Sequence, residues 1–212
     1  MTRGIGAIQL LQHLVPGWVI PLFIFITYLG SLWVIFPLLT LLYWRWDTER
    51  TAFVGSAVLG GVALAFTLKN TFELARPPVS LHLVHATGYG FPSGHAIDST
   101  VTYGALASVV RAGTRWQRIL FGSGLVALVA LSRVVLGVHF AIDVVVGIGV
   151  GLAYLFVVVR LLDRQVVPSL LLATALAVTG VIVTGGVLGS MILLGGVLVA
   201  LAGWVRREGS DV

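Results

Sequence analysis

The sequence predicts an all-α integral membrane protein, a polytopic bundle of six to seven transmembrane helices. Hydrophobic residues make up 58% of the 212 residues and charged residues only 10%. The mean hydropathy is +1.05, and the charged residues stand at the ends of long apolar runs. A span needs about 20 apolar residues, so six or seven spans use about 120 to 140 of them. We therefore expect a single membrane domain over residues 1–212, with no separate soluble domain.

The N-terminal segment precedes the first long apolar run. Met1–Gln12 carry one arginine and no small-residue cleavage site, so we expect no removable signal peptide. Residues 1–16 instead predict a short interfacial helix.

Seven apolar runs follow, separated by charged residues or by proline and glycine. They predict spans at Gly17–Trp44, Ala52–Leu74, Gly94–Val110, Ile119–Leu136, Phe140–Leu162, Leu170–Thr184 and Val187–Val205. The last two, within residues 166–205, are short and joined only by Gly185 and Gly186. The alternative for them is one re-entrant hairpin, which would leave five full spans and a partial one.

The cations indicate how the bundle is oriented. When the spans alternate across the bilayer, nine arginines fall on one side: Arg45, Arg50, Arg111, Arg115, Arg118, Arg160, Arg164, Arg206 and Arg207. The other side receives Arg3, Lys69, Arg76 and Arg133. The positive-inside rule then places the first group in the cytoplasm of a cell membrane and the N-terminus outside. The net charge of +5 is not gathered in one basic tract, so we expect no nucleic-acid partner.

Three polar clusters lie on the predicted outer side. The first is Lys69, Glu73 and Arg76, spaced at i, i+4 and i+7. This spacing predicts one polar stripe if the second span stays helical to its end. Pro77 and Pro78 would then stop the helix. Two cations at the top of a span are suited to holding an anion, although simple snorkelling to the interface is the alternative.

The second cluster is Phe91-Pro92-Ser93-Gly94-His95, at the start of the third span. Proline and serine suit the first positions of a helix, and the free N–H groups there favour a bound phosphate. His95 adds a group that is able to transfer a proton.

The third cluster runs from Ser132 and Arg133 through Gly137 to His139 and Asp143. Gly137 predicts the end of one span, and His139 opens the next. His139 and Asp143 are i and i+4, so the carboxylate is expected within reach of the ring. Such an aspartate fixes the histidine tautomer and leaves the outer nitrogen nucleophilic.

Together these residues resemble the three-part signature of the type 2 phosphatidic acid phosphatase family. The resemblance rests on Lys69 with Arg76-Pro77, on Pro92-Ser93-Gly94-His95, and on Ser132-Arg133 with His139 and Asp143. All eleven signature positions match, across residues 69–143. The flanking segments match no motif.

The resemblance implies a metal-independent phosphoryl transfer, with no cofactor. His139 would attack phosphorus and form a phosphohistidine, Asp143 would orient it, and His95 would protonate the leaving oxygen. The phosphate-binding residues implied are Lys69, Arg76, Ser93, Gly94, Ser132 and Arg133.

These expectations favour a lipid phosphatase whose active site opens on the extracytoplasmic face. A site at the ends of spans suits a phosphate held at the headgroup level of the bilayer. Polyprenyl diphosphate is slightly favoured over phosphatidate and phosphatidylglycerol phosphate by analogy alone. A lipid phosphotransferase using the same site is the first alternative. A transporter or channel is a distant one, because the spans outside the signature carry almost no ionisable groups. The oligomeric state is not indicated.

Overall fold

The computed structural model describes residues 4–210, and every regular element in them is helical, which confirms the predicted class. The helices are α1 Ile5–Leu14, α2 Ile20–Tyr28, α3 Leu32–Arg45, α4 Thr48–Phe72, α5 Gly94–Val109, α6 Arg115–Val135, α7 Ala141–Phe156, α8 Val166–Thr184 and α9 Leu188–Ser210. Short turns of 3₁₀ helix lie at Gly17–Val19 and Val79–Leu81, and a π-helical turn, Val157–Leu161, extends α7.

Five helices of the described chain are long and apolar enough to cross a membrane, rather than the six or seven expected. They are α4, α6, α7 with its extension, α8 and α9. A sixth span arises if α1 and Gly17–Tyr28, which meet at a bend of 98°, count as one. The predicted third span corresponds to α5, which has only 16 residues and buries Asp98, Ser99, Thr100 and Thr102. α5 carries this polar face because α4, α6 and α7 pack around it and shield it from lipid.

The predicted span Gly17–Trp44 is wrong as a single helix. α2 ends at Tyr28, and Ser31 caps α3 by accepting a hydrogen bond from the Trp33 N–H at 3.3 Å. Gly30 lies at the break, where an added Cβ would meet Val129 and the His95 carbonyl oxygen. The chain therefore bends where it must pass close to α5, and uniform hydropathy on both sides hides this break in the sequence.

The ends of the chain follow the expected pattern more closely. Helix α1 exists within residues 1–16, and its Ile8 is buried in a cluster with Ala130, Val134 and Phe140. Its placement at the membrane interface stays a prediction. Helices α8 and α9 both have the length and apolar composition of full spans. The structure therefore favours two C-terminal spans over a re-entrant hairpin.

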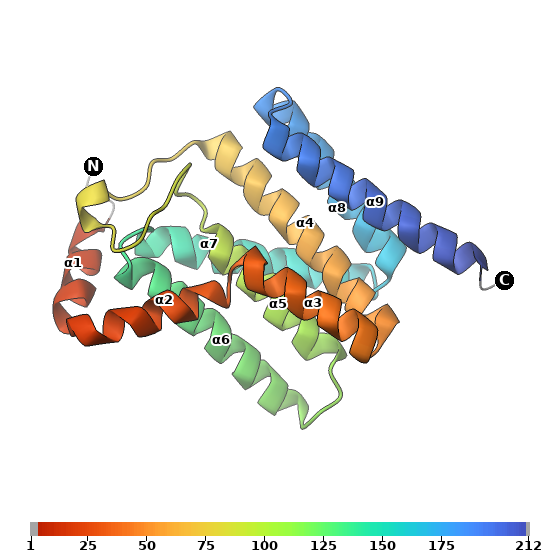
Figure 1. Ribbon diagram of the computed structural model, residues 1–212, viewed down its shortest axis with the longest axis horizontal. Helices are drawn as coiled ribbons and strands as arrows, with labels where there is room; N and C mark the ends of the chain where they lie inside the picture. The colour runs from red at the N-terminus through yellow and green to blue at the C-terminus, as the bar shows by residue number, and fades with distance from the viewer. Residues whose placement is uncertain (1–3, 211–212) are drawn as a thin grey trace.

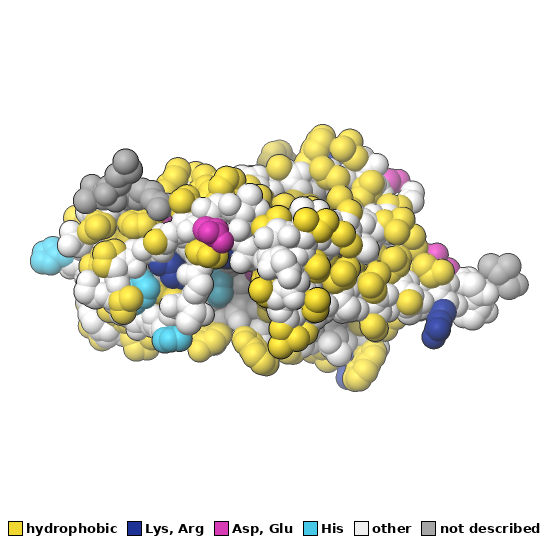
Figure 2. All heavy atoms as spheres, turned by 90° about the horizontal axis from the view of Figure 1, so that it is seen from above, with side chains coloured by type: hydrophobic (Ala, Val, Ile, Leu, Met, Phe, Trp, Pro, Cys, Tyr) yellow, Lys and Arg dark blue, Asp and Glu magenta, His cyan; other side chains and the backbone are white. Residues whose placement is uncertain are grey.

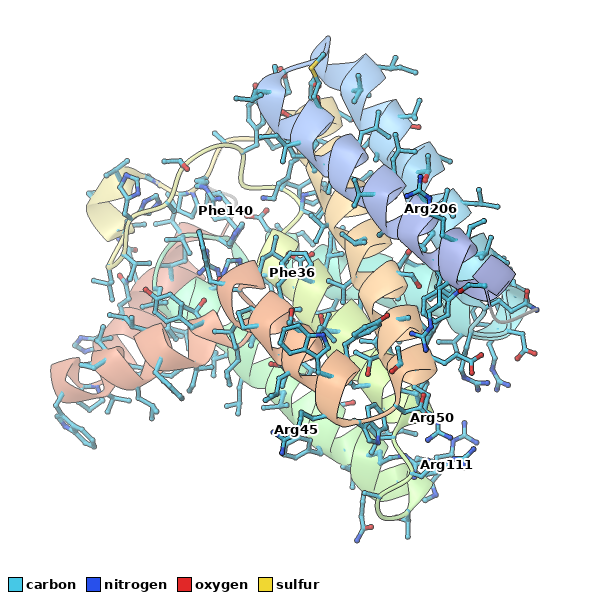
Figure 3. The ribbon with its side chains drawn as sticks, turned by 45° about the vertical axis from the view of Figure 1, so that its right-hand side comes forward. Phe36, Arg45, Arg50, Arg111, Phe140 and Arg206 are labelled. Atoms are coloured by element: carbon cyan, nitrogen blue, oxygen red, sulfur yellow. The ribbon has the colours of Figure 1, made fainter. Side chains whose placement is uncertain are left out.

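The bundle has two chemically different ends. Helices α4 and α6 finish at the end where α5 and α7 begin, and the 73–93 loop covers that end (Figure 1). Lys, Arg and His side chains gather in a hollow there, whereas hydrophobic side chains cover most of the same view elsewhere (Figure 2). Figure 3 shows Phe140 near this end and Arg45, Arg50 and Arg111 near the opposite one.

Candidate active site

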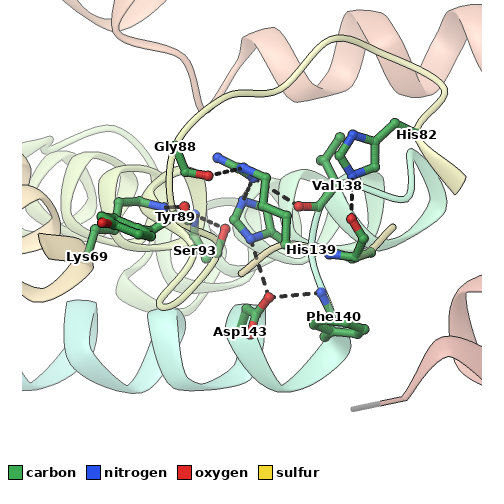
Figure 4. Close-up of polar contacts among 12 residues, drawn as sticks. Lys69, His82, Gly88, Tyr89, Ser93, Val138, His139, Phe140 and Asp143 are labelled. Atoms are coloured by element: carbon green, nitrogen blue, oxygen red, sulfur yellow. Dashed lines mark hydrogen bonds and ion pairs between the residues drawn. The ribbon is translucent and has the colours of Figure 1, made fainter. Parts of the chain in front are cut away.

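His139 and Asp143 form the buried centre of the site. Helix α6 ends at Val135, and Gly137, with φ of 72°, turns the chain toward α7. His139 precedes the helix rather than opening it, and Asp143 stands in the first turn of α7. One Asp143 oxygen, Oδ2, accepts the Phe140 N–H at 2.9 Å and lies 3.6 Å from His139 Nδ1 (Figure 4). The carboxylate therefore faces the ring as expected, at an ion-pair distance longer than a hydrogen bond.

The other ring nitrogen of His139 faces Arg76. Arg76 Nη1 lies 3.0 Å from His139 Nε2. Because a guanidinium only donates hydrogen bonds, Nε2 must accept, and the ring proton belongs on Nδ1 facing Asp143. Burial lowers the pKa of His139 well below its ordinary value, and the charges of Arg133, Arg76 and Lys69 add to this effect. His139 is therefore a neutral imidazole whose Nε2 lone pair points at a cation.

Arg76 also fixes the loop that covers the site. Its guanidinium donates to the carbonyls of Thr87 at 2.9 Å, Gly88 at 3.1 Å and Val138 at 2.9 Å. The Val138 carbonyl precedes His139 directly, so one side chain ties the loop to the histidine. This places Arg76 at the centre of the predicted phosphate site and gives it a structural role that the sequence did not indicate.

The predicted stripe of Lys69, Glu73 and Arg76 does not form. Helix α4 ends at Phe72, and Glu73 takes a left-handed backbone conformation with φ of 50°. Arg76 thus reaches the site from the loop rather than from the helix. The Glu73 carboxylate hydrogen-bonds the Tyr89 side chain and so raises the pKa of that phenol.

Lys69 still reaches the site from the last turn of α4. Its Nζ donates to the Tyr89 carbonyl at 2.9 Å. Its Cε would lie 3.3 Å from a Cβ added at Gly94, so the lysine packs directly against the start of α5. A side chain at position 94 would therefore crowd the ammonium group.

Ser93 caps α5, as the sequence predicts. Its hydroxyl accepts the Ala96 N–H at 3.4 Å, and its own N–H donates to the Asp143 carbonyl at 2.9 Å. The second and third clusters of the sequence are therefore joined through the backbone. His95 is the second residue of α5, and the charges of Arg133, Lys69 and Arg76 act on its ring.

Arg133 joins the site, whereas the Ser132 hydroxyl is engaged in its own helix. Arg133 is 7% exposed, and its Nη1 donates to the Thr27 hydroxyl at 2.7 Å. Its buried Nε has no hydrogen-bond partner among the described residues. Ser132 Oγ donates to the Val129 carbonyl at 2.6 Å, so its predicted role in phosphate binding stays a prediction. The sequence did not indicate Thr27 as a partner of Arg133. The contact joins α2 to α6, and a sequence pattern indicates only contacts between residues that are near each other in the chain.

The site therefore unites three cations and two histidines around the buried Asp143, and the charge of the buried Asp98 also acts on Lys69. Such groups suit an anion that carries several oxygen atoms, such as a phosphate, because the cations and the helix N–H groups can bind different oxygens of the same anion. Among residues 4–210 no group of three or more His, Cys, Asp or Glu side chains is arranged to hold a metal ion.

Residues 50–167, more than half of the chain, match the PAP2 superfamily, and the chain belongs to that superfamily. It is 35% identical to phosphatidylglycerophosphatase B of Bacillus subtilis (strain 168) over 97 residues, which are 43% of this chain and 47% of that protein. The match therefore spans about half the length of that relative. It is 33% identical to the "Putative undecaprenyl-diphosphatase YbjG" of Escherichia coli (strain K12) over 148 residues, 64% of this chain and 69% of that protein.

Two solved structures share the fold. The crystal structure of Aquifex aeolicus LpxE matches with a TM-score of 0.61 and 25% identity, over 74% of this chain and 94% of that one. The transmembrane PAP2 type phosphatidylglycerolphosphate phosphatase from Bacillus subtilis matches with a TM-score of 0.59 and 26% identity, over 75% of this chain and 86% of that one. Family and fold thus agree with the resemblance seen in the sequence.

The turn at Gly137 gives a direct test of how the site is held. An added Cβ there would collide with the Leu81 carbonyl oxygen, and φ is positive as well. Gly137→Ala should therefore displace His139 and lower kcat/KM by about 10²-fold, the cost typical of an ångström-scale misplacement. Steady-state kinetics and the apparent Tm of the purified protein measure the effect.

Gly88→Ala is the matched control. Gly88 has φ of 68° but nothing within 4 Å of an added Cβ, so it carries only the backbone strain, about 1–2 kcal/mol. Gly88→Ala should keep most of the activity. Equal losses in the two variants would show that the contact between Gly137 and Leu81 does not position His139.

Proposed function

We propose that this protein hydrolyses a lipid phosphate or diphosphate through a phosphohistidine intermediate. The observation that carries the proposal is the line formed by Asp143, His139 and Arg76. Asp143 lies behind Nδ1 at 3.6 Å, and Arg76 lies in front of Nε2 at 3.0 Å. A phosphoryl oxygen of the substrate could accept the Arg76 hydrogen bond in place of His139 Nε2. The phosphorus atom would then lie next to Nε2, the nucleophilic nitrogen.

The reaction then takes two steps. In the first, the Nε2 lone pair of His139 attacks phosphorus, the bond from phosphorus to the leaving oxygen breaks, and His95 gives that oxygen a proton. In the second, water attacks the phosphohistidine, the phosphorus–nitrogen bond breaks, and His95 takes the proton from water. The products are inorganic phosphate and either a lipid alcohol, from a lipid phosphate, or a lipid monophosphate, from a lipid diphosphate.

The three cations stabilise the charge that spreads over the equatorial oxygens in the transition state. Lys69 and Arg133 come from the last turns of α4 and α6, and Arg76 comes from the loop. Ser93 and the Gly94 N–H add the positive end of α5. Buried Arg133 Nε, which has no partner in the described chain, supports this assignment because it is free to take a phosphoryl oxygen.

The substrate is proposed to be an amphiphile with its phosphate at the extracytoplasmic surface. Two relatives bear names that refer to phosphatidylglycerophosphate and undecaprenyl diphosphate, and both are lipids with a terminal phosphate. Polyprenyl diphosphate remains slightly favoured. Phosphate release from a panel of lipid phosphates, with and without a lipid alcohol acceptor, tests the substrate. Transfer to the acceptor in place of phosphate release would identify a phosphotransferase.

The two histidines should respond differently to the leaving group. His95→Ala should lose about 10² to 10⁴-fold on an alkyl phosphate, the usual contribution of a general acid. It should recover much of this on an aryl phosphate, whose phenolate leaves without a proton. His139→Ala should be inactive on both substrates, because no covalent intermediate forms. Equal inactivity of His95→Ala on both, or rescue of His139→Ala, would refute these roles.

Turnover should not require a metal ion, because cations and histidines do not suit magnesium and the central carboxylate, Asp143, is already engaged by the Phe140 N–H and His139. Activity should persist in excess chelator. Vanadate, which adopts five-coordinate geometry, should inhibit. Loss of activity in chelator with recovery on adding magnesium would contradict the proposal.

The orientation is testable because the chain contains no cysteine. Thr87 and Thr114 are exposed and lie at opposite ends of the bundle. In cells, Thr87→Cys should react with an impermeant thiol reagent added outside, whereas Thr114→Cys should react only after permeabilisation. The reverse pattern would place the site in the cytoplasm.

A further inference from the structure

A second cavity lies at the far end of the helices that build the active site. It is formed by α5, α6 and α7 and has a volume of about 640 Å³. Small side chains line this space, among them Ala107, Ser123 and Ala127. Gly104 and Gly122 also line it and let Leu155 and Tyr103 pack closely against α5 and α6. Leucines and isoleucines of α6 and α7 complete its walls. The volume lies within the usual range of ligand sites, about 300–1,000 Å³.

The length of the groove matches one leaflet of a bilayer. It extends along α6 from Arg115 to Ala127, which at 1.5 Å per residue is roughly 18 Å. The hydrocarbon core of a membrane is about 30 Å thick. Half of that thickness, roughly 15 Å, belongs to one leaflet, so a groove of this length is deep enough to take an acyl chain.

The mouth of the groove is strongly cationic. Arg115, Arg118, Arg160 and Arg164 line it. Of these four arginines, Arg164 forms an ion pair within the described residues, with Asp163 at 3.7 Å. Arg118 is held in place by donating to the carbonyls of Ala107 at 3.2 Å and Gly113 at 3.0 Å. The apolar groove thus ends in guanidinium groups, the side chains that recognise phosphate best.

The position of two of these arginines on α6 points to an external anion. Arg115 opens the helix and Arg118 follows within its first turn, and the first turn contains no acidic residue. The N-terminus of a helix carries a partial positive charge, so cations are disfavoured there and anions are favoured. A negatively charged group bound at the mouth would offset both the helix dipole and the arginines.

We propose that this groove binds one anionic diacyl phospholipid from the leaflet opposite the active site. The phosphate lies between the arginines at the mouth, and an acyl chain fills the space beside Gly122, Ser123 and Ala127. The proposal concerns binding at the non-catalytic end of the bundle and is independent of the proposed phosphatase activity.

The test measures binding of dioleoyl phosphatidylglycerol and dioleoyl phosphatidylcholine to the full chain in detergent, by native mass spectrometry. The groove variant is Arg115→Gln with Arg160→Gln. The control is Arg45→Gln with Arg111→Gln, which removes the same charge from exposed sites outside the groove on the same side. Ser123→Leu fills the groove without changing charge, at a position that is exposed along its wall.

The wild type and the control should each bind one phosphatidylglycerol in preference to phosphatidylcholine. The groove variant should bind it about thirtyfold more weakly, at about 1 kcal/mol for each arginine removed, and Ser123→Leu should lose it. The apparent Tm of the purified protein should be unchanged in all variants, which verifies the fold. Equal weakening in groove and control variants, equal binding of the two lipids, or full binding by Ser123→Leu would overturn the proposal. If the double variant does not fold, Ser123→Leu decides the question.

Discussion

The structure depends on keeping several charges buried at one end of an apolar bundle. An unpaired buried charge is so costly that each must find partners within the protein. Lys69 donates to the Tyr89 carbonyl, and Arg76 donates to carbonyls of the loop and of Val138. Arg133 donates to the Thr27 hydroxyl. Neutral backbone oxygens, one hydroxyl and the neutral His139 ring therefore make the direct contacts to the cations, so their positive charge stays available to a phosphate.

The same contacts fix the geometry around the histidine. Arg76 binds the loop at Thr87 and Gly88 and also binds the carbonyl next to His139. The loop is further tied to the end of α6, because the Leu83 N–H donates to the Leu136 carbonyl at 3.0 Å. Gln12 of α1 bridges the carbonyls of Leu81 and Val135. A loop without regular structure over most of its length is in this way tied to α1, to the end of α6 and to the residue before His139.

Local features of the site could be predicted from the sequence, and long-range ones could not. The cap at Ser93, the turn at Gly137 and the approach of Asp143 to His139 each depend on residues within a few positions, and the structure contains all three. The helical class followed from composition alone. The break between α2 and α3 and the bond from Arg133 to Thr27 depend on segments about a hundred residues apart. The stripe on α4 was wrong because helical periodicity does not report that the chain leaves the helix at Glu73.

The up-and-down course of four helices explains why an anion site arises at this end. Helices α4 and α6 arrive with their C-termini, where the dipole favours cations, and their last turns carry Lys69 and Arg133. Helices α5 and α7 leave with their N-termini, where free N–H groups favour anions, and Asp143 occupies the first turn of α7. The dipoles thus stabilise cations on two helices and attract a phosphate to a third. At the opposite end the arrangement is reversed for α6, where Arg115 opposes the dipole. An anion from outside the chain, as proposed above, would relieve that opposition.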